Sequence, residues 1–254
     1  MNDDKSKQGT FVEHLAELRS RLLKSFVYLF IFFITSYFFA ENIYAFLVEP
    51  YAQAVKDDPV KRRFIFTALH ETFVTYLKLA FFTSLFISSP IILTQVWKFI
   101  APGLYKNEKR ALLPYMVATP TLFLLGGMLV YYLVMPLAIK FFLTFETAAI
   151  SGTLPIQLEA KVNEYLSLIM RLIFAFGISF QLPVLLSLLA RVGFIDSKYL
   201  RSRRKFVVVI IFVIAAILTP PDPITQIGLG IPLLILYELS ILSVSFIEKK
   251  KKDA

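Results

Sequence analysis

Six apolar runs dominate the 254-residue chain and restrict what it can fold into. A helix of about 20 residues crosses the hydrocarbon core of a bilayer, which is about 30 Å thick. Most of the runs reach that length; they are 22–40, 73–100, 111–135, 165–190, 206–219 and 224–247. The hydrophobic fraction of 57% and the mean hydropathy of +0.68 exceed those usual in soluble domains. We therefore predict an all-α membrane protein with six transmembrane helices, in which residues 1–254 form a single integral membrane domain.

The distribution of basic residues predicts the orientation of this domain. Segments 1–24, 98–110, 191–205 and 249–252 hold 19 of the 27 Lys and Arg residues, and the other connections hold 6. Because cytosolic loops of membrane proteins are enriched in Lys and Arg, both termini and the loops after the second and fourth runs are expected in the cytosol. The net charge of +9 then reflects orientation, and we expect no nucleic-acid partner.

Two features of the runs predict the shape of the wall that they build. Run 206–219 amounts to only about 21 Å of helix, and a short span thins the bilayer around it. The second, third, fourth and sixth runs contain proline, which predicts kinks, although transmembrane helices often tolerate proline. Kinked helices of unequal length favour a curved, concave wall over a tight bundle. In residues 136–164 we expect a short helix that lies across the outer surface.

Several kinds of chemistry are excluded by composition. The chain has no cysteine, which rules out disulfides and thiolate metal sites. The two histidines, His14 and His70, have no ligand partners at metal spacing, so no metal site is expected. We find no nucleophile–base set and no Gly-rich phosphate loop, and therefore predict neither an enzyme nor a bound cofactor.

The stretch 11–22 carries acidic and basic residues just before the first apolar run. Leu15, Leu18 and Leu22 recur at helical spacing, and Glu17 lies four residues before Arg21. We interpret the stretch as an amphipathic helix that lies on the membrane surface and leads into the first span.

Acidic residues are few on the predicted cytosolic side, which makes Glu17 and Glu108 candidates for a binding site. If the first two spans are neighbours, both carboxylates can face one pocket. Two carboxylates suit a ligand with two guanidinium groups, because arginine binds carboxylate through a planar fork. The simpler alternative is pairing with nearby basic residues, such as Arg19 and Lys106, as is common at protein surfaces.

Polar side chains inside the apolar runs are the other candidates for function. They are Gln95, Arg171, Gln181, Gln226 and Glu238. Charges at this depth are costly and usually face protein or water, although Arg171 is near enough to the outer surface to reach it. Gln181 can hydrogen-bond a partner helix or its own chain. An alternative function is therefore a small-solute or ion transporter that uses Glu238 and Gln181.

Four motifs, spread in order along the chain, carry a family resemblance. They are HLAELRSRL at 14–22, QVWKFIAPGLYKNE at 95–108, FGISFQLP at 176–183 and TPPDP at 219–223. With the six runs, they resemble the TatC family, the multispanning core of the twin-arginine protein translocase. The resemblance implies a glove-like fold in the bacterial inner membrane. It also implies a receptor for twin-arginine signal peptides that moves folded proteins by the proton-motive force, with self-association and TatA/TatB-type single-span partners.

The resemblance also implies roles for particular residues. The signal-peptide surface comprises Glu17, Arg19, Phe99, Tyr105, Lys106 and Glu108. Gln181, Gln226 and Glu238 are the polar groups available to partner helices within the membrane. Pro50 belongs to an outer loop, and Asp222 has a structural or outer-loop position. The family commonly has Glu at the position of Gln181, where this chain has a neutral side chain that still donates and accepts hydrogen bonds.

Overall fold

Helices make up most of the structure, a computed structural model that describes residues 3–56, 62–100, 109–147, 154–219 and 222–252. They are α1 (Asp3–Phe38), α2 (Ala40–Ala54), α3 (Glu71–Ile100), α4 (Lys109–Leu129), the π-helix η3 (Val130–Val134), α5 (Met135–Leu143), α6 (Val162–Ser179), α7 (Leu182–Val192), α8 (Ser197–Leu218) and α9 (Pro223–Lys252). In these ranges, strand pairing is limited to two isolated bridges, Ile65 with Lys161 and Thr147 with Ile156. The predicted all-α fold is confirmed.

Five helical segments of the described chain are long and apolar enough to cross a membrane. They are Glu13–Phe38, Glu71–Phe99, Pro114–Leu143, Val162–Val192 and Pro223–Lys249. The remaining predicted span falls on α8, in which the apolar part, 206–218, directly follows the basic sequence RSRRK. That apolar part is about 20 Å long, as expected for the short run. The sixth span stays a prediction.

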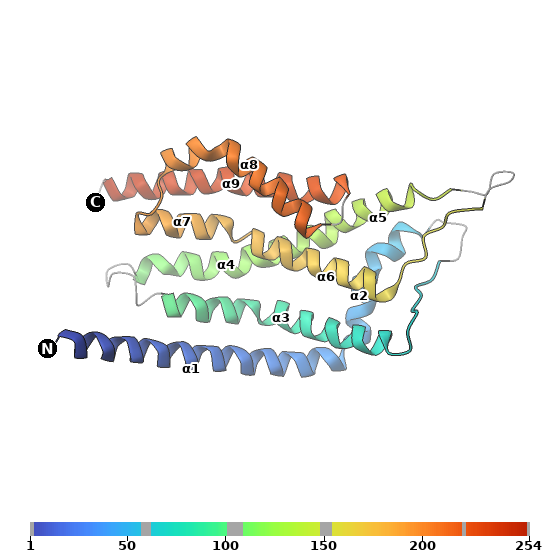
Figure 1. The fold of residues 1–254 in the computed structure, drawn as a ribbon, viewed down its shortest axis with the longest axis horizontal. Coiled ribbons are helices and arrows are strands. Elements are labelled where there is room, and N and C mark those ends of the chain that lie inside the picture. The colour runs from blue at the N-terminus through green and yellow to red at the C-terminus, as the bar shows by residue number, and fades with distance from the viewer. Residues whose placement is uncertain (1–2, 57–61, 101–108, 148–153, 220–221, 253–254) are drawn as a thin grey trace.

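The N-terminal part of α1 is not a separate surface helix. Residues 11–22 are helical as predicted, but α1 continues without a break from Asp3 to Phe38 as one rod (Figure 1). Residues 11–38 contain neither glycine nor proline, so nothing in the sequence turns the helix at the membrane surface. The expectation of a helix lying on that surface is therefore wrong.

The third span is longer than predicted. Its helix passes through η3 and continues as α5 to Leu143, so the short helix expected across the outer surface is the end of a span instead. Pro136 lies in the first turn of α5, where its missing N–H costs little stability. The π-helical turn just before it has a wider hydrogen-bond pattern than an α-helix, and the helix continues through it past the proline. The run therefore does not end at residue 135.

Proline interrupts the helices at some of the predicted places. α6 ends at Ser179 and α7 begins at Leu182, directly before Pro183. α3, α4 and α9 continue through their prolines, which are Pro90, Pro114, Pro120 and Pro232. At Pro90, the Ser89 hydroxyl donates to the Phe86 carbonyl at 2.7 Å, which satisfies the group that proline leaves without a partner.

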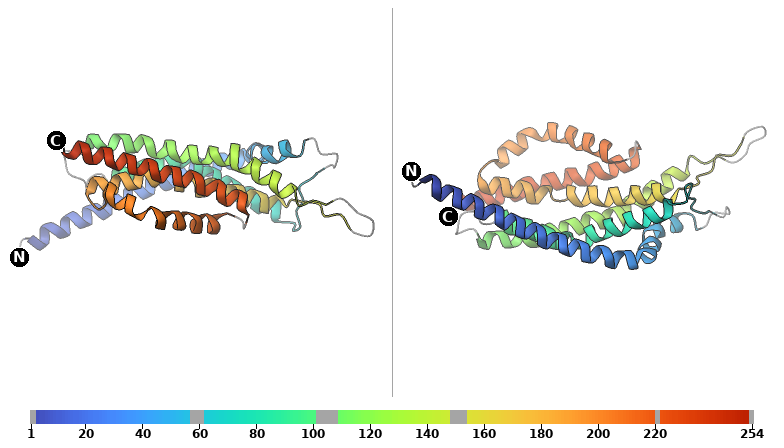
Figure 2. Two further views of the ribbon diagram at one scale, coloured as in Figure 1. Left: turned by 90° about the horizontal axis from the view of Figure 1, so that it is seen from above. Right: turned by 60° about the horizontal axis from the view of Figure 1, so that its bottom comes forward.

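The helices form an open row rather than a closed bundle. α1 packs along α3, α4 and α6 pack against α3 and each other, and α7 and α8 pack on α9. α1 and α8 stand at opposite ends of the row (Figures 1 and 2). α2 crosses one end of it, where the Tyr131 hydroxyl donates to the Phe46 carbonyl at 2.7 Å. This arrangement agrees with the predicted concave wall.

Candidate functional site

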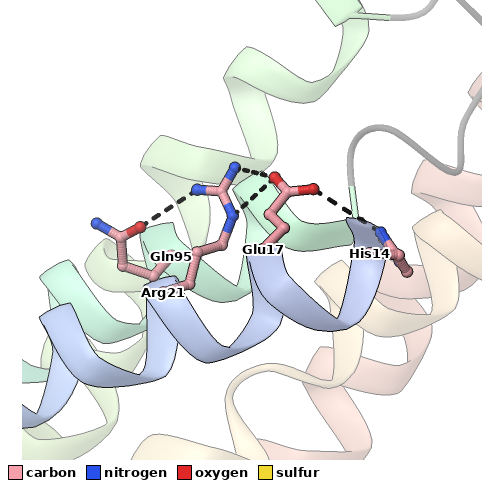
Figure 3. A network of polar contacts seen from close by, with 4 residues as sticks. All are labelled: His14, Glu17, Arg21 and Gln95. Atoms are coloured by element: carbon pink, nitrogen blue, oxygen red, sulfur yellow. Dashed lines mark hydrogen bonds and ion pairs between the residues drawn. The ribbon is translucent and has the colours of Figure 1, made fainter. Parts of the chain in front are cut away.

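One carboxylate near the start of the row is held by a network between α1 and α3 (Figure 3). Arg21 donates from Nε and Nη2 to Oε1 of Glu17, at 3.0 and 2.5 Å. Its Nη1 donates to Oε1 of Gln95 on α3 at 3.3 Å. The side chains of Glu17 and Arg21 are 32% and 23% exposed, so the pair is half-buried yet open to solvent. Arg21 thus uses three nitrogens to tie the Glu17 carboxylate to the neighbouring helix.

The second oxygen of Glu17 faces a pair of stacked rings. Oε2 lies 3.8 Å from Nδ1 of His14, and the His14 ring stacks on Phe99 with centroids 4.4 Å apart and planes at 17°. In the described part of the chain, Oε2 accepts no hydrogen bond. A carboxylate oxygen that accepts no hydrogen bond and lies beside two stacked rings can accept a planar cationic group.

The structure brings only some of the predicted surface residues together. His14 joins Glu17 to Phe99. Arg19 lines a different, shallow hollow together with Leu15, Ala16, Ser20, Leu23 and Lys24, which includes none of these three residues. Tyr105, Lys106 and Glu108 lie outside the described residues. Among the described residues, Glu17 forms its ion pair with Arg21 and not with Arg19.

Gln181 lies at the break between α6 and α7. Its Nε2 donates to the Thr119 carbonyl at 3.1 Å and to the Gly177 carbonyl at 3.3 Å, so the bond within its own chain is the alternative that the structure shows. Its Oε1 is buried and accepts no hydrogen bond from any residue that the structure describes. The Gln181 side chain therefore links the end of α6 to α4 through the Thr119 carbonyl, and its Oε1 is an unused hydrogen-bond acceptor.

Three other polar candidates form hydrogen bonds to α8 or within their own helical turn; they are Glu238, Gln226 and Asp222. Arg204 of α8 donates to Glu238 at 2.6 Å, with both side chains half exposed. Gln226 donates weakly to the Phe212 carbonyl at 3.4 Å. Asp222 is buried and caps the start of α9 by accepting from the amide of Thr225 at 2.7 Å and from its hydroxyl. Glu238 is therefore an ion-pair partner and not an isolated charge.

Pro50 has a different setting from the one expected. It lies buried inside α2 rather than in a loop. The Tyr165 hydroxyl donates at 3.0 Å to the Leu47 carbonyl, which lies in the helical turn that leads to Pro50 and Tyr51. The sequence after the first span is polar, so hydropathy did not predict the helix α2 there.

Together these features define an integral membrane protein made of an open row of helices, with a polar cluster where the first two long helices meet. The chain belongs to the TatC family, because residues 13–232 match the model of the Sec-independent protein translocase protein TatC. Members of this family are translocase components and not enzymes.

Curated relatives and solved structures agree with this assignment. The chain is 46% identical over 253 residues to the TatC protein of Magnetococcus marinus, covering 100% of this chain and 90% of that one. It is 45% identical to that of Rickettsia prowazekii, covering 95% of each, and 37% identical to that of Escherichia coli K12, covering 95% and 90%. A crystal structure of the twin-arginine translocase receptor TatC superposes with a TM-score of 0.76 at 36% identity, covering 92% of this chain and 99% of that one.

Proposed function

We propose that this chain is the signal-peptide receptor and core subunit of a twin-arginine translocase, which moves folded proteins across the bacterial inner membrane by the proton-motive force. Family membership and the likeness to receptor structures support this function. The observation that carries the binding site is the open Oε2 of Glu17 beside the stacked rings of His14 and Phe99.

The chemistry of this cluster suits a guanidinium group. One arginine of the signal peptide would bind Oε2 of Glu17 and lie against the rings, since guanidinium groups pair with carboxylates and stack on aromatic faces. Glu108 would receive the second arginine. Arg19, Tyr105 and Lys106 complete the proposed surface by family resemblance.

We place both termini and this surface in the cytosol, with α8 as the sixth span. The basic start of α8 and the Lys249–Lys252 segment support this orientation. Gln181, Gln226 and Glu238 are the proposed contacts for TatA/TatB-type single-span partners, and Pro50 and Asp222 support the outer part. Self-association belongs to the same proposal.

The alternative of a small-solute transporter has less support. It needs Glu238 and Gln181 to converge on a substrate. Instead, Glu238 pairs with Arg204, and the Gln181 amide donates to two backbone carbonyls of its own chain.

The test is a binding titration of a fluorescent peptide with two adjacent arginines against the purified chain in nanodiscs. Glu17→Gln keeps the shape but removes the charge, and we expect binding to weaken at least about tenfold. Glu13→Gln is the matched control, since it removes the same charge one turn earlier on α1 and should bind nearly as the unmodified chain does. Unchanged binding by Glu17→Gln would reject this site.

A further inference from the structure

Two cations lie inside the apolar runs of neighbouring helices. Lys78 is seven residues after the start of α3, and Arg171 is nine residues after the start of α6, about 10 and 14 Å along their helices. Both side chains are exposed. Both positions belong to candidate membrane spans, Glu71–Phe99 and Val162–Val192. Charged side chains at such depth cost free energy unless they find a partner, so each calls for an explanation.

Polar contacts place both cations along one seam between α3 and α6. Oδ1 of Asn163 accepts from Nζ of Lys78 at 3.1 Å and from the Thr75 hydroxyl at 3.4 Å. The Ser167 hydroxyl also donates to Asn163, at 3.4 Å. Further along, the rings of Phe82 and Phe174 lie 5.3 Å apart. The two helices therefore run side by side from the same end (Figure 1).

Helix geometry places Arg171 on the same side of this seam as Lys78. Asn163, Ser167 and Arg171 are spaced four residues apart and span about 80° around α6. Ile173 lies about 80° from Asn163 in the opposite direction around α6. Together with Thr83 of α3 it lines an apolar pocket of about 410 Å³ on the opposite side of the seam. The cations thus share one face, and the apolar pocket occupies the other.

The cations have no acidic partner in the described part of the chain. The acids at the same end are already engaged. Oε2 of Glu71 accepts from the amides of Thr67 and Ala68 at 2.7 and 3.2 Å, and Glu164 lies 3.6 Å from Lys161. Neither Lys78 nor Arg171 lies within ion-pair distance of a described carboxylate. The positive charges of both exposed side chains are therefore not neutralised by any described carboxylate.

We propose that Lys78 and Arg171 bind the phosphate of one anionic phospholipid in the outer leaflet. Side chains on a helix point toward its N-terminus, which is the outer end of both helices in the orientation proposed above. Long cationic side chains reach the headgroup level in this way. Arginine binds phosphate through two parallel hydrogen bonds, and lysine binds it as a point charge.

The test measures phospholipid retention on the intact purified chain by native mass spectrometry in detergent, with phosphatidylglycerol and phosphatidylcholine added in equal amounts. The unmodified chain should retain phosphatidylglycerol preferentially. Lys78→Gln with Arg171→Gln should retain it about 25-fold more weakly, since each of the two cations contributes about fivefold. Lys56→Gln with Lys140→Gln is the matched control, because it removes two exposed cations from the same end but away from the seam.

Two further variants and one competitor sharpen the result. The charge-preserving pair Lys78→Arg with Arg171→Lys should retain the lipid, which separates loss of charge from loss of fold. Equal retention by the Gln pair and the unmodified chain would overturn the proposal, as would equal loss in the control. Inorganic phosphate alone should not bind measurably. If the Gln pair instead loses a co-purified single-span protein and keeps phosphatidylglycerol, the anion is a carboxylate of that protein and the lipid site is refuted.

Discussion

Arg21 contacts Glu17 and Gln95 at the same time, and this joins one turn of α1 to a residue 74 positions away on α3. The guanidinium occupies one oxygen of the carboxylate that we propose as the receptor for a peptide arginine. Under this proposal, an internal arginine and an incoming peptide arginine share the same acidic group. The pair is partly exposed and four residues apart on one helix, so its own contribution to stability is small, about 0.2–1 kcal/mol.

We predict that Arg21→Gln strengthens binding of a twin-arginine peptide by up to about fivefold at low salt. The change frees Oε1 of Glu17 and removes a positive charge beside the incoming one. The measurement is the peptide titration in nanodiscs at two salt concentrations, and the gain should shrink at high salt. Lys24→Gln removes the same charge one turn further on and should give a smaller gain. Weaker binding by Arg21→Gln would show that Arg21 orients Glu17 instead of competing for it.

Hydropathy predicted the spans well because transmembrane helices must be long and apolar, whatever their neighbours are. It failed where continuity depended on local geometry. The turn of π-helix before Pro136 carries the third span onward to Leu143, and no residue pattern announces it. The helix α2 was missed since its residues are mixed in polarity and gain stability from contacts such as Tyr131 with Phe46.

The candidate site was predictable only in part. The spacing of Glu17 and Arg21 is visible in the sequence, and their ion pair follows from it. The partnership of Arg21 with Gln95 and the stacking of His14 on Phe99 depend on how α1 lies along α3. Such contacts arise from tertiary packing, and a periodicity argument does not contain them. The expected meeting of Glu17 with Glu108 falls outside the described residues.

The close approach of α4 and α6 predicts a strong response to a single methyl group. A Cβ on Gly126 would lie 2.8 Å from the Phe176 carbonyl oxygen, a backbone atom that cannot move aside easily. Gly126→Ala should therefore lower the stability by about 1–3 kcal/mol, measured by thermal unfolding in detergent. On Gly228 the nearest atoms would be 3.7 Å away on Val134, so Gly228→Ala is the control and should be neutral or slightly stabilising. Equal effects from both substitutions would contradict this packing.

A buried hydrogen bond between α3 and α4 supports a second stability prediction. Nε1 of Trp97 donates to the Thr119 hydroxyl at 2.8 Å, and both side chains are buried. Thr119→Val keeps the volume but leaves the indole N–H without an acceptor, which should cost about 1–3 kcal/mol in thermal unfolding. Thr121→Val, at an exposed position two residues later, should cost little. A shift of Trp97 fluorescence in the first variant, absent in the second, would tie the loss to this bond.

The length of α8 makes a prediction about the membrane itself. Its apolar part, 206–218, measures about 20 Å against a hydrocarbon core of about 30 Å, and it follows four basic residues directly. Carrying those charges into the core would cost more than deforming the lipid, so the bilayer should thin around α8. A spin label at Val213, near the middle of the apolar part, should lie about 5 Å shallower than one at Ile87 of α3, both being exposed positions. Equal depths for the two labels, measured by oxygen and nickel accessibility, would mean that the bilayer keeps its full thickness beside α8.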